Sequence, residues 1–132
     1  MSNCIINQAV EAVMDLIDGL GLFAPIYRGP LGTDNGLCCE LGPTSPDEVY
    51  LDKNRYIPVD LTINGKHNDL NILTEALNTI DESLTMRTSY PSTATWKIVD
   101  ISTATEPQVI NREDSNQYVM ASSLLVKIET KR

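Results

Sequence analysis

The spacing of apolar residues changes along this chain, and that change narrows the folds open to it more than any other feature. Between residues 3 and 20, apolar side chains recur every three or four positions, which is the spacing of one buried helix face. Residues 68–86 repeat this pattern, whereas apolar and polar residues alternate over 57–63 as in a half-buried strand. Two helices separated and followed by strands indicate an α+β fold.

Both predicted helices have recognisable end signals. Ser2 and Asn3 are candidate N-caps of the first helix, and Gly19 and Gly21 are expected to end it, because glycine adopts a left-handed conformation without steric cost. Asn68 is the predicted N-cap of the second helix. The preceding Asn64-Gly65 dipeptide is interpreted as a turn that leads into this helix instead of closing a hairpin.

Strands are predicted in the rest of the chain. They cover 24–28, 37–41, 49–51, 57–63, 96–101, about 108–112 and about 117–129. Because Pro58 has no backbone N–H, the strand containing it is expected to have an unpaired or irregular stretch there, which would offer a docking edge. No composition shift marks a boundary, so residues 1–132 are expected to form a single domain. The expected architecture is two helices packed on one face of a mostly antiparallel sheet.

The chain is acidic, and this charge disfavours nucleic acids as partners. It has 10 Lys and Arg residues against 18 Asp and Glu residues, for a net charge of −8. That is the wrong sign for binding a phosphate backbone, so nonspecific nucleic-acid binding is disfavoured. No sequence-specific nucleic-acid partner is expected either. Charges interrupt the apolar stretches before the roughly 18 residues that a spanning helix needs, and no basic leader precedes them, so no membrane partner is expected. Three cysteines, two of them adjacent, fit a reducing cytoplasm.

The residues that carry chemistry do not form a catalytic pattern. His67 is the only histidine, and its place at a helix entrance favours a surface or capping role. Cys38 and Cys39 have no basic neighbour to activate a thiolate, so packing is the favoured role, with one thiol inward and one outward. The glycine-rich stretch 29–36 lacks the lysine and hydroxyl residue of a phosphate loop. The acidic pairs are interpreted as solvated faces or loop tips; they are Asp47-Glu48, Asp81-Glu82 and Glu113-Asp114. We therefore expect no catalytic residue, no cofactor and no metal site, and the chain is predicted not to be an enzyme.

One long stretch of the chain resembles a known class of proteins. Residues 24–70 read APIYRGPLGTDNGLCCELGPTSPDEVYLDKNRYIPVDLTINGKHNDL. This stretch resembles the minor structural proteins, often called minor capsid proteins, of tailed bacteriophages and prophages. The resemblance continues through the second predicted helix, the strand at 96–101 and the segment 120–124. The order of elements is also similar to that of phage tail terminator and tail-completion proteins, which form a ring, commonly a hexamer, between the tail tube and the head.

This resemblance implies a structural role in virion assembly. The implied protein is a tail terminator or head–tail joining subunit that self-associates into a ring, commonly of six copies, and binds tail tube or head–tail connector proteins. It would be found in the host bacterial cytoplasm during assembly and in the virion afterwards. Six copies at −8 each would carry −48. Charge of this sign facing a channel would repel DNA and let a packaged genome slide through.

Four residues are candidates for the contact between ring subunits. Arg28, Tyr50, Arg55 and Tyr56 are selected because Tyr and Arg are enriched at interface cores. An equally weighted interpretation is that Tyr50 and Tyr56 cover the sheet edge within their own subunit. Two further functions stay open: a minor capsid or head-completion protein on the portal side, and a small cytoplasmic binding module or hydrolase with a pocket at His67 or Cys39.

Overall fold

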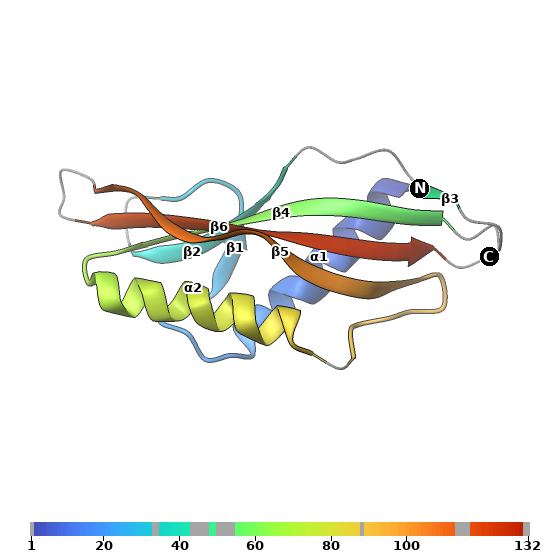
Figure 1. Cartoon of the computed structure of the whole chain (residues 1–132), viewed down its shortest axis with the longest axis horizontal. Helices are drawn as coiled ribbons and strands as arrows, with labels where there is room; N and C mark the ends of the chain where they lie inside the picture. Colours follow the sequence, from blue (N-terminus) through green and yellow to red (C-terminus); the bar gives the residue numbers. More distant parts are fainter. Residues whose placement is uncertain are drawn as a thin grey trace.

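The computed structural model has one sheet and two helices (Figure 1) and describes residues 2–32, 35–42, 48–49, 55–87, 89–112 and 117–130. In chain order the elements are α1 (Ser2–Asp18), β1 (Ile26–Arg28), β2 (Gly36–Leu41), β3 (Glu48–Val49), β4 (Arg55–His67), α2 (Leu70–Thr85), β5 (Trp96–Arg112) and β6 (Tyr118–Thr130). The α+β class predicted from the changing apolar period is confirmed.

The sheet is mostly antiparallel, as expected. Its strands follow the order β1-β2-β4-β6-β5, and the short β3 also pairs with β4. The pairing of β1 with β2 is parallel, and each of the other pairings is antiparallel. β1 and β5 are therefore the two ends of this strand order, and β4 and β6 form its centre.

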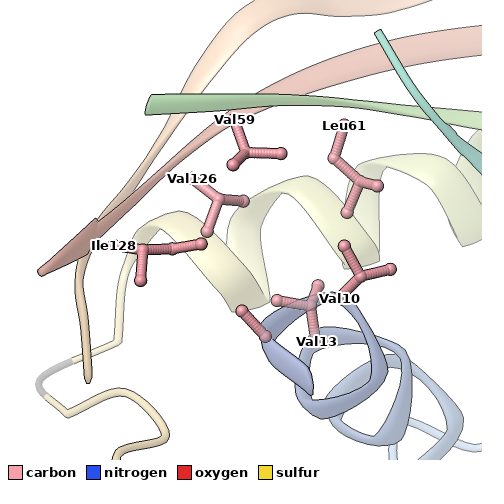
Figure 2. Close-up of a pocket in the computed structure, with 7 residues that line it drawn as sticks. Val10, Val13, Val59, Leu61, Val126 and Ile128 are labelled. Atoms are coloured by element: carbon pink, nitrogen blue, oxygen red, sulfur yellow. The ribbon is translucent and has the colours of Figure 1, made fainter. Parts of the chain in front are cut away.

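Both helices pack on the same face of the sheet. Figure 2 shows apolar side chains of α1 opposite those of β4 and β6; the residues of this contact are Ala9, Val10, Val13, Val59, Leu61, Val126 and Ile128. α2 packs on the same face through Leu73 and Leu77, which are buried and lie next to Gly65 of β4. The apolar residues of the alternating stretch thus point into one core, which supplies most of the driving force for folding; they are Ile57, Val59, Leu61 and Ile63.

Polar side chains tie each helix to the edge strand β5. The Trp96 indole Nε1–H donates to Gln8 Oε1 of α1 at 2.8 Å. The Thr103 hydroxyl donates to Asp81 Oδ1 of α2 at 2.8 Å. These two bonds hold β5 against the helix layer from both helices, although β5 has only β6 as its strand neighbour.

Gly65 is not in a turn, contrary to the interpretation of Asn64-Gly65. It lies inside β4, opposite Met120 of β6 and Leu37 of β2. A Cβ at this position would come within 2.6 Å of Leu73 Cδ1, well inside ordinary carbon contact. The glycine is needed here because α2 packs directly on the backbone of the strand.

Two further predictions from the sequence are wrong: the N-cap of α2 and the number of strands that follow α2. The N-cap is Asp69, not Asn68: its Oδ1 accepts the Asn71 backbone N–H at 2.9 Å. The predicted strands at 96–101 and 108–112 are one continuous strand, β5, with several register shifts. The shift between Ile98 and Asp100 places both Ile98 and Ile101 on the buried face, which a regular alternation would not allow.

Beside Pro58, where an irregular stretch is expected, one side of β4 has no registered strand partner among the described residues. On one side, β4 pairs with β6 without a break, and Pro58 is opposite Lys127. On the other side, β3 pairs with 55–56 and β2 pairs with 61–66, so within the described chain no strand residue is registered opposite 57–60. On this side the Asp60 carbonyl accepts the Gly42 backbone N–H at 2.7 Å. Pro58 itself is buried, so the gap is not an exposed edge at that residue.

Candidate assembly surface

The structure describes two of the four predicted interface side chains. Arg28 ends β1 and is exposed, and its Nη1–H donates to Asn7 Oδ1 of α1 at 2.8 Å. Tyr56 lies in β4 and is half-buried. Arg55 is the first residue of β4, opposite Thr130, but its side chain is outside the described part; Tyr50 lies outside the described residues.

Arg28 and Tyr56 do not share a surface patch. Arg28 is registered next to Cys39 of β2, and Cys39 is registered next to Ile63 of β4. Tyr56 precedes Ile63 by seven residues, which is roughly 23 Å along an extended strand. Any contact that uses both residues must therefore cover most of the length of the sheet.

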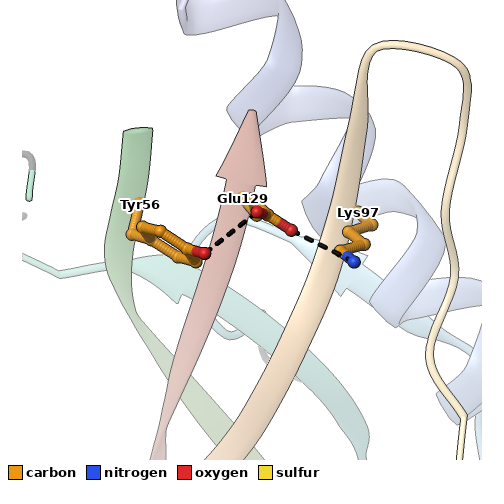
Figure 3. A network of polar contacts seen from close by, with 3 residues as sticks. All are labelled: Tyr56, Lys97 and Glu129. Carbon is orange, nitrogen blue, oxygen red and sulfur yellow. Dashed lines mark hydrogen bonds and ion pairs between the residues drawn. The ribbon is translucent and has the colours of Figure 1, made fainter. Parts of the chain in front are cut away.

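Tyr56 belongs to a polar network on the sheet face opposite the helices (Figure 3). Its hydroxyl donates to Glu129 Oε2 at 2.9 Å, and Lys97 Nζ lies 3.1 Å from Glu129 Oε1. Lys127 Nζ lies 5.3 Å from the centre of the Tyr56 ring, within cation–π range. Glu129 is only 7% exposed, so these donors offset the cost of burying its carboxylate. The network joins β4, β6 and β5, which supports the interpretation that Tyr56 serves its own subunit.

The same face has a shallow neutral hollow where β5 departs from regular pairing. It has a volume of about 190 Å³. Its lining residues are small or uncharged: Thr62, Thr105, Gln108, Ala121, Ser122 and Ser123. The register passes from Thr105 opposite Ser123 to Gln108 opposite Ala121, so β5 has one residue more than β6 in this stretch. The hollow is thus a product of the bulge, and it has no charged or titratable lining group.

The two thiols of β2 are both buried. Cys38 and Cys39 point to opposite faces, as predicted, but the outward Cys38 is covered as well. Burial raises the pKa of Cys38, with a further contribution from the Glu40 carboxylate. Burial, followed by the neighbouring Cys38, raises the pKa of Cys39 to about 11, although Arg28 acts in the opposite direction. Neither thiol is activated toward a thiolate at neutral pH.

His67 shapes the entrance to α2, in agreement with the capping interpretation. Its Nδ1 accepts the Asp69 backbone N–H at 2.8 Å, and its ring packs edge-on against Phe23 at 4.7 Å between centroids. In the described residues, no group of three or more His, Cys, Asp or Glu side chains is placed to hold a metal ion. None of the helices described here has the length and apolar character to cross a membrane.

The glycine-rich loop is anchored by two buried polar side chains that the sequence did not single out. Lys66 Nζ donates to the Gly32 carbonyl at 2.8 Å, and Gln117 Nε2 donates to Asn35 Oδ1 at 2.8 Å. Both anchoring residues are nearly inaccessible to solvent. Lysine and glutamine are surface residues in most contexts, so no local pattern marks these two as loop anchors.

All charged side chains of the two helices are acidic. α1 contains Glu11, Asp15 and Asp18, α2 contains Glu75, Asp81 and Glu82, and neither helix contains Lys or Arg. The opposite sheet face contains lysines together with carboxylates, including Lys97 paired with Glu129. The side chains of each helix therefore carry a net charge of −3.

No protein-family model matches this chain, and no curated protein matches it. Among solved structures, the chain is similar in fold to a chain in the virion of a native gene transfer agent particle, with a TM-score of 0.56. The two sequences are 15% identical, and the match covers 89% of this chain and 85% of that chain. At this identity the likeness establishes a shared fold.

Proposed function

We propose that this chain is a structural virion protein of a tailed phage or prophage, which acts as a tail terminator or head–tail joining subunit in a ring. The observation that carries the proposal is the fold shared with a chain of a gene transfer agent virion over 89% of the length. The resemblance of residues 24–70 to phage minor structural proteins, drawn from the sequence alone, points to the same class. The protein would work in the bacterial cytoplasm during assembly and remain in the virion.

The distribution of charge supports a role in which the protein lies next to DNA without binding it. Six carboxylates and no basic residue lie on the two helices. If the helix layer faces the channel of a ring, these carboxylates repel the phosphate backbone and keep the passage free for a moving genome. A basic lining would instead retain the DNA through ion pairs.

The chain is proposed to act without catalysis. The hydrolase alternative needs an available nucleophile or base at Cys39 or His67. Burial raises the pKa of the Cys39 thiol, and His67 Nδ1 is engaged by the backbone of Asp69. Both residues therefore have structural partners that explain their presence. Replacing Cys39 or His67 is expected to alter stability but not virion assembly beyond the loss of folded protein.

The oligomeric state and the phenotype of a gene deletion test this proposal. Light scattering and negative-stain images of the pure protein are expected to show rings, and virions are expected to contain the chain. A deletion in the phage is expected to give filled heads without tails beside free tails if the ring joins the two, and tails of uncontrolled length if it terminates them. A chain absent from purified virions, whose deletion leaves particle yield unchanged, would refute the proposal.

A minor capsid or head-completion protein on the portal side is the second candidate. The resemblance of residues 24–70 favours it, because that class includes minor capsid proteins. Labelling the chain in purified particles separates the two roles. Label on the head after tail removal supports the portal side, whereas label on the end of isolated tails supports the terminator.

A further inference from the structure

Two exposed, oppositely charged residues lie on the two opposite edge strands of the sheet. Arg28 ends β1, and its guanidinium donates to the neutral Asn7 amide. Glu106 is exposed on β5. Within the described part of the chain, neither residue has an ion-pair partner. The positive charge on one edge is thus matched by a negative charge on the other.

Exposed apolar side chains also gather on these edges. Tyr27 on β1 is 66% exposed, and Val109 and Ile110 on β5 are 51% and 59% exposed. Half of the exposed large apolar side chains in the described residues therefore lie on the two edge strands. Next to Tyr27, the loop residues Pro30 and Leu31 line a hollow of about 340 Å³. A hollow of this kind can receive apolar side chains from another surface.

We propose that the β1 edge of one copy of this chain binds the β5 edge of a second copy. In this contact Arg28 faces Glu106, and the hollow beside Tyr27 receives Val109 and Ile110. The proposal rests on the ring proposed above and names the two surfaces by which its subunits meet.

Charge favours this heterologous contact over a symmetric one. Pairing β5 with β5 around a twofold axis brings Glu106 toward its own copy, and pairing β1 with β1 does the same for Arg28. For Arg28 and Glu106, the pairing of unlike edges is the one that brings these two opposite charges together. Because a contact between two different surfaces repeats around an axis, it generates a ring when the rotation closes.

Side chains, and not a continuous backbone ladder, are expected to form the contact. β5 has register shifts at four places along its pairing with β6 and contains Pro107, which has no N–H to donate. Irregularities of this kind prevent indiscriminate strand pairing at a free edge. The specific groups on the edge then decide which surface can bind.

Charge exchange across the two edges tests the proposal. Light scattering over a concentration series measures the concentration at which half of the chains are assembled. Four full-length proteins are compared: wild type, Arg28→Glu, Glu106→Arg and the double variant. Each single variant places like charges opposite each other and is expected to raise the concentration for half-assembly about 10-fold or more. The double variant restores the attraction and is expected to return it to within about 3-fold of wild type.

Matched controls and a cross-link decide the remaining outcomes. Arg87→Glu and Glu75→Arg change charge equally at exposed positions off both edges, and they are expected to leave assembly unchanged. Leu31→Cys mixed with Ile110→Cys is expected to give a disulfide-linked pair of chains that neither variant gives alone. A cross-link of Ile110→Cys with itself, or a wild-type chain that is monomeric at its highest soluble concentration, overturns the edge contact.

Failure of this contact is distinct from failure of the proposed function. If wild-type rings form, but neither charge exchange nor the cysteine pair has an effect, the edge contact is wrong and the ring role stands. If the chain is missing from virions, the proposed function fails, whatever the edges do. Variants that unfold, detected by thermal denaturation, are replaced by Arg28→Gln and Glu106→Gln, for which a loss of assembly without repulsion is expected.

Discussion

Replacing Gly65 by alanine is expected to destabilise the protein by about 1–2 kcal/mol. The added Cβ would lie 2.6 Å from Leu73 Cδ1 and 3.1 Å from Leu37 Cδ2, against roughly 3.5–4.0 Å for ordinary carbon contact. Leu73 is fully buried, so its methyl group cannot retreat by the required ~1 Å without displacing α2 from the sheet. Overpacking of this kind costs about 1–3 kcal/mol, and the lower backbone entropy of unfolded alanine returns about 0.4–1 kcal/mol.

Urea unfolding followed by far-ultraviolet circular dichroism measures this cost, and the melting temperature is expected to fall by roughly 4–8 °C. Leu73→Ala alone is expected to cost about 2–5 kcal/mol through the cavity that it leaves. Because the two changes compensate in volume, the double variant is expected to cost about 1–2 kcal/mol less than their sum. Gly32→Ala is the control, since no atom lies within 4 Å of its Cβ position. Wild-type stability in Gly65→Ala, or strict additivity in the double variant, would show that α2 does not rest on this backbone.

Three further changes test the polar contacts and the buried thiol. Gln8→Ala removes the acceptor of the Trp96 indole N–H and is expected to lower stability by about 0.5–1.5 kcal/mol, with a change in the emission of this single tryptophan; unchanged emission and stability would contradict the tether. Tyr56→Phe removes a donor to the buried Glu129 carboxylate and is expected to cost about 1–3 kcal/mol in urea unfolding; a neutral result would place that carboxylate in water. The Cys39 pKa is raised from 9.0 to about 11, so the free energy of unfolding is expected to fall as pH rises from 9 toward 11. Cys39→Ala is expected to make that slope shallower and to leave the part that Cys38 contributes; an equal slope in both proteins would be inconsistent with a buried Cys39 thiol.

Local periodicity was enough to predict much of the fold. The three-to-four spacing located both helices to within about two residues at each end, and the alternation over 57–63 located the centre of β4. Pro58 predicted an irregular stretch, and within the described residues no strand residue is registered beside 57–60 on the side away from β6. These features depend on residues close together in sequence, so the sequence alone contains them.

Features that depend on distant partners were not predictable. Asn64-Gly65 has the composition of a turn, yet β4 continues through it because Leu73 and Leu37 pack where a side chain would be. The sequence pattern predicts two strands where the structure has the single strand β5, since its bulges break the alternation that identifies a strand. The conformation of the chain at these positions is determined by the residues that pack against them.

The candidate site was less predictable than the fold. Arg28 was selected from residue type, and the structure places it exposed at a sheet edge. Tyr56 was selected in the same way, but it bonds Glu129 within its own chain. The exposed pair Val109 and Ile110 was not selected, because apolar residues in a predicted strand are ordinarily assigned to the core.

The position of β6 has a consequence for biosynthesis. It is the last strand in sequence, yet it lies between β4 and β5 and pairs with both along most of their lengths. A nascent chain still lacking residues 118–130 would have no template for β5 and no complete core beneath the helices. We therefore expect cooperative folding to wait until this segment has left the ribosomal exit tunnel, so that truncated translation products remain open to proteolysis.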